Sequence, residues 1–180
     1  MRNVIEVGSI THRGDAILQH IFTGHRDTWV LGGIPKEGSL FNLIRGVVPT
    51  VKAVHFPMSG SCRFNCYIAI DKKVDGETKQ AALAALGGCD FVKHVVVVDG
   101  DIDIYNEEEV MWAGATRVQA DQDVDIIKNV KGNTLDPSQT DNIMTAKMII
   151  DATKPLHRPY EARVAVPKTP MEKMRLEDFI

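Results

Sequence analysis

The sequence contains few cysteines and few aromatic residues, and neither positive nor negative charges are in large excess. Of its 180 residues only three are cysteines, and aromatic residues make up 6%. So few thiols, odd in number, are typical of a reducing cytosol, and we expect a cytoplasmic protein. The formal net charge of −3 gives no electrostatic reason to expect nucleic acid or an anionic membrane as a partner. The lack of aromatic residues interleaved with basic ones also argues against single-stranded nucleic acid.

Long hydrophobic runs and glycine-rich phosphate loops are missing as well. No apolar stretch approaches the ~20 residues that span a bilayer, and no basic segment followed by an apolar core opens the chain. We therefore expect neither a membrane span nor a secretory signal. Gly32-Gly33 precedes Ile34-Pro35, and no Gly-x-Gly-x-x-Gly or Walker-type run occurs. Nucleotide binding by this chain alone is weakly supported.

Three carboxylates follow the strand that the sequence predicts most strongly. Val95–Val98 is a short valine-rich run, which predicts an internal strand covered on both faces. Asp99, Asp101 and Asp103 come directly after it, where open α/β sheets form binding sites. In an extended backbone the three would share one face and could hold Mg²⁺. Asp also serves turns and helix starts, and no further oxygen ligand is evident, so we favour the structural interpretation.

A helix should follow this strand. Asn106 is a favourable N-cap, and the glutamates after it lie where the helix dipole favours negative charge. Val110 and Ala113 have the spacing of a buried face. Gly114 is unfavourable inside a helix, so we expect either a close packing contact there or the end of the helix.

Strands and helices alternate along the rest of the chain. We expect strands over 4–10, 51–56, 64–71, 124–130 and 148–150, helices over 39–48 and 76–86, and a loop over 24–33. The pattern predicts one α/β domain, residues 1–152, with three layers and a central, mainly parallel sheet. Prolines are frequent in residues 153–180, which we expect to form an extended arm with a short helix around 171–179 that docks on a neighbouring subunit. A loose terminus is the alternative.

Histidines and cysteines show no ligand pattern. The six histidines lack metal-ligand spacing. Cys62 and Cys66 have too few soft ligands near them for zinc and no evident base to activate a nucleophile. We assign no catalytic residue and no metal ligand. Two loops, 58–63 and 132–138, have the mixed polarity of pocket walls, although plain solvent loops would look the same.

Three segments of the chain, in order, resemble the C-terminal domain of the UbiD-type decarboxylases. They contain the motifs Ile-Thr-His-Arg (10–13), Val-Val-Asp-Gly-Asp-Ile-Asp-Ile (97–104) with Glu-Val-Met-Trp-Ala and Ala-Thr-Arg-Val (109–118), and Ala-Lys-Met-Ile-Ile-Asp-Ala-Thr (146–153). The matched segments reach from Ile10 to Lys154, which is most of the chain.

The resemblance implies a function. Members of this family decarboxylate aromatic or α,β-unsaturated carboxylic acids, or run the reaction in reverse, with prenylated FMN, a divalent metal and potassium. In the family, the flavin-binding barrel and the catalytic carboxylates precede the segment that resembles 10–18. We therefore expect this chain to be a small subunit or an excised domain that is inactive alone and joins a flavin-bearing partner in a homo- or hetero-oligomer. A non-catalytic small-molecule-binding or scaffold domain of the same fold is the alternative.

The resemblance also implies a set of substrate-binding residues. In the family the C-terminal domain supports oligomerisation and closes one side of the substrate pocket. The matching positions here are Ile17, Leu18, Ser59, Thr134, Leu135 and Pro137. Neither the identity of the carboxylic acid nor the direction of the reaction follows from the sequence.

Overall fold

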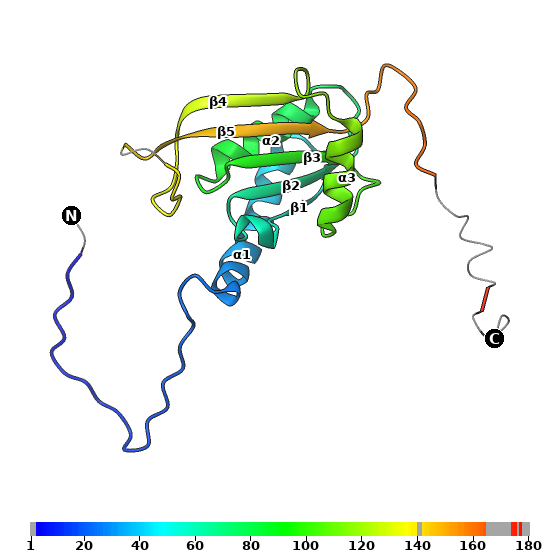
Figure 1. Cartoon of the computed structure of the whole chain (residues 1–180). Coiled ribbons are helices and arrows are strands. Elements are labelled where there is room, and N and C mark those ends of the chain that lie inside the picture. Colours follow the sequence, from blue (N-terminus) through cyan, green and yellow to red (C-terminus); the bar gives the residue numbers. More distant parts are fainter. Residues whose placement is uncertain (1–2, 140–141, 165–173, 176, 178–180) are drawn as a thin grey trace.

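The computed structural model describes residues 3–139, 142–164, 174–175 and 177. The strands form a single sheet, and the helices pack against it (Figure 1). In chain order the elements are α1 (Arg26–Val47), β1 (Val51–His55), the short 3-10 helix η1 (Met58–Gly60), β2 (Asn65–Ile70), α2 (Glu77–Gly88), β3 (His94–Asp99), α3 (Glu107–Arg117), β4 (Val124–Lys131) and β5 (Met144–Ala152).

The sheet is mixed rather than mainly parallel. Its strand order is β1-β2-β3-β5-β4. The inner strands β2, β3 and β5 are parallel, whereas β1 and β4 run antiparallel to β2 and β5 at the two edges. The expectation of a mainly parallel sheet is corrected in this respect. Each edge strand joins its neighbour through a direct connection without a crossover helix, and such a connection reverses the chain.

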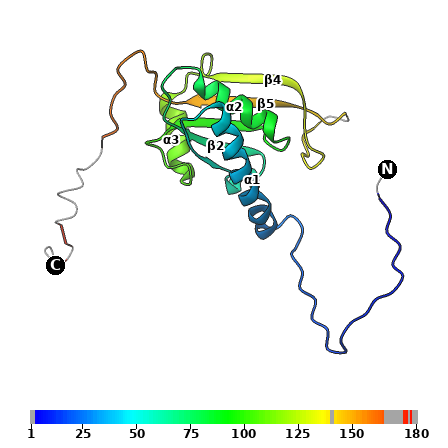
Figure 2. The same cartoon turned by 180° about the vertical axis from the view of Figure 1, so that it is seen from behind.

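Helices cover both faces of the sheet, which gives the three layers expected. Figure 2 shows α1 and α2 on one face, and α3 lies on the other face in Figure 1. On β2, Cys66, Ile68 and Ile70 pack in the core beneath α1 and α2, whereas Tyr67 and Ala69 pack in the core on the α3 side. This alternation follows from the period of two in a strand.

The strand predicted over the valine run is confirmed. β3 pairs with β2 on one side and β5 on the other, so it is internal. Val95, Val97 and Val98 are fully buried. A run without polar alternation suits this position because both faces of the strand pack against protein over at least part of their length.

The predictions for the first third of the chain were wrong in two places. The expected loop over 24–33 is mostly helix, because α1 begins at Arg26 with His25 as its N-cap. Gly33 serves packing, since a Cβ built there would lie 2.9 Å from Cys62 Cβ. The expected strand over 4–10 does not form. A strand needs a neighbour for its backbone hydrogen bonds, and this segment extends away from the domain (Figure 1).

The helix after β3 forms as expected, but Gly114 has neither predicted role. Val110 and Ala113 are buried. Asn106 accepts a hydrogen bond from the backbone N–H of Glu108, as an N-cap should. The helix continues past Gly114, and a Cβ there would meet nothing within 4 Å.

After β5 the chain has no helix or strand over residues 153–164. The helix predicted around 171–179 lies almost entirely outside the described residues, and the division at residue 152 stays a prediction. No helix in the described part of the chain is long and apolar enough to cross a membrane.

Candidate functional site

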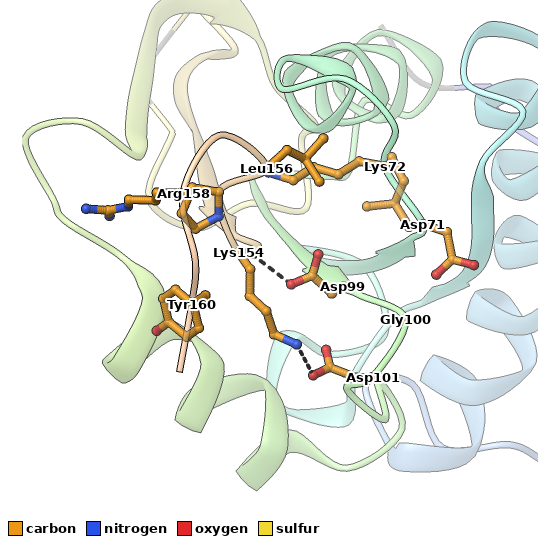
Figure 3. A pocket seen from close by; sticks show the side chains of 11 residues that line it. Asp71, Lys72, Asp99, Gly100, Asp101, Lys154, Leu156, Arg158 and Tyr160 are labelled. Atoms are coloured by element: carbon orange, nitrogen blue, oxygen red, sulfur yellow. Dashed lines mark hydrogen bonds and ion pairs between the residues drawn. The ribbon is translucent and has the colours of Figure 1, made fainter. Parts of the chain in front are cut away.

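An open pocket lies beyond the carboxyl ends of the parallel strands, where α/β sheets form binding sites (Figure 3). Its volume is about 540 Å³. The walls come from the ends of β2 and β3 and from the segment that follows β5. The lining residues are Ile70, Asp71, Lys72, Asp99, Gly100, Asp101, Lys154, Pro155, Leu156, Arg158 and Tyr160.

Two carboxylates and two cations form a closed network beside this pocket. Asp99 accepts hydrogen bonds from Arg117 Nη1 at 2.9 Å and from the backbone N–H of Lys154 at 2.8 Å. Asp101 accepts from Arg117 Nη2 at 3.0 Å and from Lys154 Nζ at 2.6 Å. The Arg117 side chain is only 1% exposed. The network therefore compensates its own charge and joins β3, α3 and the segment after β5.

The pKa values of the two carboxylates move in opposite directions. Burial raises the pKa of Asp99 above its ordinary value, and its hydrogen bonds and nearby cations only partly oppose this. Burial also acts to raise the pKa of Asp101, but hydrogen bonds from Arg117 and Lys154 outweigh it and lower that pKa.

The three carboxylates do not converge on one point. β3 ends at Asp99, so the extended geometry that would align them stops there. Asp103 instead accepts the backbone N–H of Tyr105 at 2.9 Å. Among the described residues no group of three or more His, Cys, Asp or Glu could hold a metal ion. Asp99 and Asp101 instead bind Arg117, and Asp103 binds its own turn; the structural interpretation of the three stays a prediction.

The predicted substrate-binding residues lie elsewhere. The η1 loop precedes β2 and the 132–143 loop precedes β5, so both lie at the edge where the parallel strands begin. Ser59 donates a hydrogen bond to Glu107 Oε1, which also accepts from the Tyr67 hydroxyl at 2.9 Å. Burial, helped by that bond to Glu107, raises the pKa of Tyr67 to about 12.

The 132–138 loop presents three of those residues together. Thr134, Leu135 and Pro137 are exposed, whereas Asp136 between them is buried. Two hydrogen bonds hold the loop at Asn133. Its side chain donates to Asp90 Oδ2 at 3.0 Å and accepts from the backbone N–H of Leu135.

Ile17 and Leu18 lie apart from the other predicted residues. They are 96% and 91% exposed, in the extended segment before α1. No hydrogen bond or ion pair within the described residues joins Ser59 to the 132–138 loop. The structure thus groups the loop residues and separates Ser59 and the N-terminal pair from them. The substrate-binding role of all six stays a prediction.

Sequence reasoning missed two lysines, one partly buried and one buried. Lys93 pairs with Asp136 at 2.8 Å. Lys147 is 1% exposed, and its Nζ donates to the backbone oxygens of Leu86 at 3.1 Å and Cys89 at 3.4 Å, at the end of α2. Burial lowers the pKa of Lys147. A single lysine inside the apolar part of β5 was a usable signal, whereas nothing local marked Lys93.

Known proteins share this sequence and fold. The pattern of the UbiD_C family, the 3-octaprenyl-4-hydroxybenzoate carboxy-lyase C-terminal domain, matches residues 29–152. Anhydromevalonate phosphate decarboxylase of Aeropyrum pernix is 41% identical over 152 residues, which are 84% of this chain and 33% of that protein. Two solved enzymes are also similar in structure.

The first is the UbiD-class enzyme HmfF from Pelotomaculum thermopropionicum in complex with FMN, with a TM-score of 0.79 and 46% identity over 86% of this chain and 34% of that one. The second is the closed form of vanillic acid decarboxylase (ShVdcCD) from Sedimentibacter hydroxybenzoicus, with a TM-score of 0.74 and 32% identity over 85% of this chain and 33% of that one. This chain therefore spans about a third of the length of the relatives that it matches.

Proposed function

Because the chain belongs to the family of UbiD C-terminal domains, we propose that it is one component of a prenylated-FMN-dependent decarboxylase or carboxylase. Its substrate would be an aromatic or α,β-unsaturated carboxylic acid. The observation that carries this proposal is the match of sequence and fold, with 46% identity and a TM-score of 0.79 to a UbiD-class enzyme. Both curated and solved relatives bear decarboxylase names.

The role proposed for this component is to form one wall of the substrate pocket and to support assembly. Exposed residues at the start of the parallel strands support this role, because Leu135 is 58% exposed on a loop that a hydrogen bond and an ion pair hold in place. The 3–25 segment is exposed throughout and carries apolar side chains such as Ile17 and Leu18 that its own domain leaves uncovered. A second chain would bury them.

We expect residues outside the described part of this chain to bind the cofactor. HmfF is known as an FMN complex and, in an evolved dimeric form, as a prFMN complex. The described residues of this chain do not fit a flavin with its metal. They contain no cluster of metal-ligating side chains, and Asp99 and Asp101 already bind Arg117 and Lys154. We propose that a flavin-bearing subunit, or the rest of a longer chain, holds prenylated FMN, the divalent metal and potassium.

A scaffold role is the second candidate. The network of Asp99, Asp101, Arg117 and Lys154 is charge-compensated and offers no free acid or base to the pocket at the strand ends. A non-catalytic domain of the same fold would look like this, since a fold does not dictate a function.

Reconstitution separates the two candidates. The chain is expressed with and without a flavin-domain protein from the same source, and each preparation receives prenylated FMN and a panel of aromatic and unsaturated acids. We expect a complex of defined mass by native mass spectrometry and CO2 release only from that complex. Turnover by this chain alone, or failure to form any complex, would contradict the proposal.

A further inference from the structure

Among the described residues, no helix covers one half of the α3 face of the sheet. α3 lies over the part of the sheet near the strand ends, where its core partners include Val98 and Ala152 (Figure 1). Nearer the strand starts, the register sets Ile126 beside Met148, and Met148 beside His94, on this same face. Ile126 is 63% exposed. Parallel strands are usually covered on both faces, so this half of the face is open to a ligand or partner.

An open pocket of about 520 Å³ lies over this region, and we call it the Lys128 pocket. Its apolar surface comes from Ile126, Met144 and Ala146. A volume of this size suits a small ligand, and pockets for such ligands combine apolar walls with a few polar groups. The full lining is Lys93, His94, Ile126, Lys128, Asn129, Ser138, Met144, Thr145 and Ala146.

The ionisable side chains that line the Lys128 pocket are, among the described residues, all of basic residue types. Of the described residues, the lining holds two lysines and a histidine and no Asp or Glu, although the chain as a whole carries a formal charge of −3. Lys93 is compensated from outside the lining by Asp136. Lys128 is exposed and makes no hydrogen bond or ion pair within the described residues. Within the described residues, the ammonium of Lys128 therefore lies beside an apolar surface without a counter-charge.

Local backbone geometry shapes the rim of this pocket. Between the pairs Ile127–Lys147 and Val130–Thr145, β4 advances by one residue more than β5, which is a β-bulge. Asn129 lies within this bulge, and its φ of 58° is in the left-handed region. His94 forms another side, and its ring is held by Asn65 Oδ1 at 3.0 Å from Nδ1. The bulge at Asn129 and the hydrogen-bonded ring of His94 thus border the pocket.

We propose that the Lys128 pocket binds a small apolar carboxylate, with the carboxylate on Lys128 Nζ and the apolar body on Ile126 and Met144. An ammonium attracts a carboxylate as a point charge and donates hydrogen bonds to it. The pocket reaches the 132–138 loop through Ser138. The inference that its ligand is the substrate or product acid rests on the proposed function, whereas binding by this chain alone does not.

Titration of the isolated chain tests the site. The probe is benzoate, with neutral benzamide of nearly the same shape as comparison, and backbone amide shifts of Thr145 and Ala146 are followed by NMR. We expect benzoate to cause saturable chemical-shift changes at these amides, and benzamide to bind more weakly than benzoate. Lys128→Met should weaken benzoate binding by about tenfold or more. Lys131→Met is the matched control, because Lys131 lies on the same strand outside this lining and its loss should change nothing.

Several outcomes would overturn the site. They are the absence of saturable shifts in the wild-type chain, equal binding by Lys128→Met and wild type, and shifts confined to the pocket around Asp99. Loss of assembly with a flavin-bearing protein in Lys128→Met, without benzoate binding by the wild type, would identify a protein interface instead and so also overturn it. Failure of the reconstituted complex to turn over would contradict the proposed function alone, because the benzoate titration needs no partner.

Discussion

The ammonium of Lys93 lies 2.8 Å from a carboxylate oxygen of Asp136, and this ion pair joins the residue before β3 to the middle of the 132–138 loop. Lys93 also donates to Ser138 Oγ at 2.6 Å. Asp136 accepts from both the backbone N–H and the hydroxyl of Ser138. Asp136 is 4% exposed, whereas its neighbour Leu135 is 58% exposed. An ion pair with a buried carboxylate thus holds a loop on which Leu135 is exposed, which is how a scaffold presents contact residues.

Loss of this pair should destabilise the chain. Asp136→Asn leaves the largely buried ammonium of Lys93 without its counter-charge, and we expect a loss of roughly 2 kcal/mol in the free energy of unfolding by urea denaturation. Asp125→Asn is the matched control. Its partner Lys79 lies at 2.9 Å, but the two side chains are 40% and 55% exposed. That pair should contribute below about 1 kcal/mol. Equal effects of the two substitutions would contradict a special role for Asp136.

Asp101 should make stability depend on pH on the acid side. Although burial opposes it, hydrogen bonds from Arg117 and Lys154 lower its pKa in the folded state. The unfolded chain then binds the proton more readily, so this stabilisation is fully present above the unfolded pKa of about 3.9 and is lost as pH falls through the lower folded value. Unfolding free energies of wild type and Asp101→Asn, measured from pH 3 to 6 (about one unit below to two above that pKa), should converge towards the acid end. A constant difference across this range would contradict the prediction.

Two glycines of α1 should respond oppositely to alanine. A Cβ at Gly33 would lie 2.9 Å from Cys62 Cβ and 3.2 Å from its backbone oxygen, so Gly33→Ala should cost about 1–3 kcal/mol through overpacking. Gly38 is in the same helix and its Cβ would meet nothing within 4 Å. Gly38→Ala should therefore stabilise by about 0.5–1 kcal/mol. Thermal denaturation of the two variants gives the comparison, and destabilisation by both would show that the helix contact is not the cause.

Trp112 should contribute less than a fully buried tryptophan. Its ring is partly buried, and the guanidinium carbons of Arg163 and Arg117 lie 4.5 Å and 5.4 Å from the ring centroid. We expect Trp112→Ala to cost about 1–3 kcal/mol, below the roughly 3–5 kcal/mol of a buried aromatic residue. Trp112→Phe keeps a ring for the two cations and should cost less. A loss below about 0.5 kcal/mol for the alanine variant would place Trp112 with ordinary surface residues.

Leu135 should influence substrate preference in the assembled enzyme. If the 132–138 loop is a wall of the pocket, Leu135→Ala should change the ratio of kcat/KM for a large and a small substrate by about 10- to 200-fold, while complex mass and flavin content stay unchanged. Val47→Ala is the control, because Val47 is 55% exposed at the far end of α1. An unchanged ratio would remove Leu135 from the pocket.

Several local features were predictable from the sequence because neighbouring residues decide them. The valine run predicted β3, and Asn106 predicted the start of α3. Each depends on backbone periodicity or on a cap within three residues. The motifs shared with the UbiD family also extend along the chain and needed no fold to be seen.

Tertiary structure alone decided which distant groups meet. Gly33 looked like a turn residue until the packing of α1 on the Cys62 loop explained it. Arg117 compensates Asp99 across 18 positions, and Lys147 reaches Leu86 across 61. The Lys128 pocket lies where α3 does not cover the starts of β3 and β5, and a bulge in β4 shapes its rim. A sequence states charge and size at each position, but only the folded chain determines which charges are buried together and which faces remain uncovered.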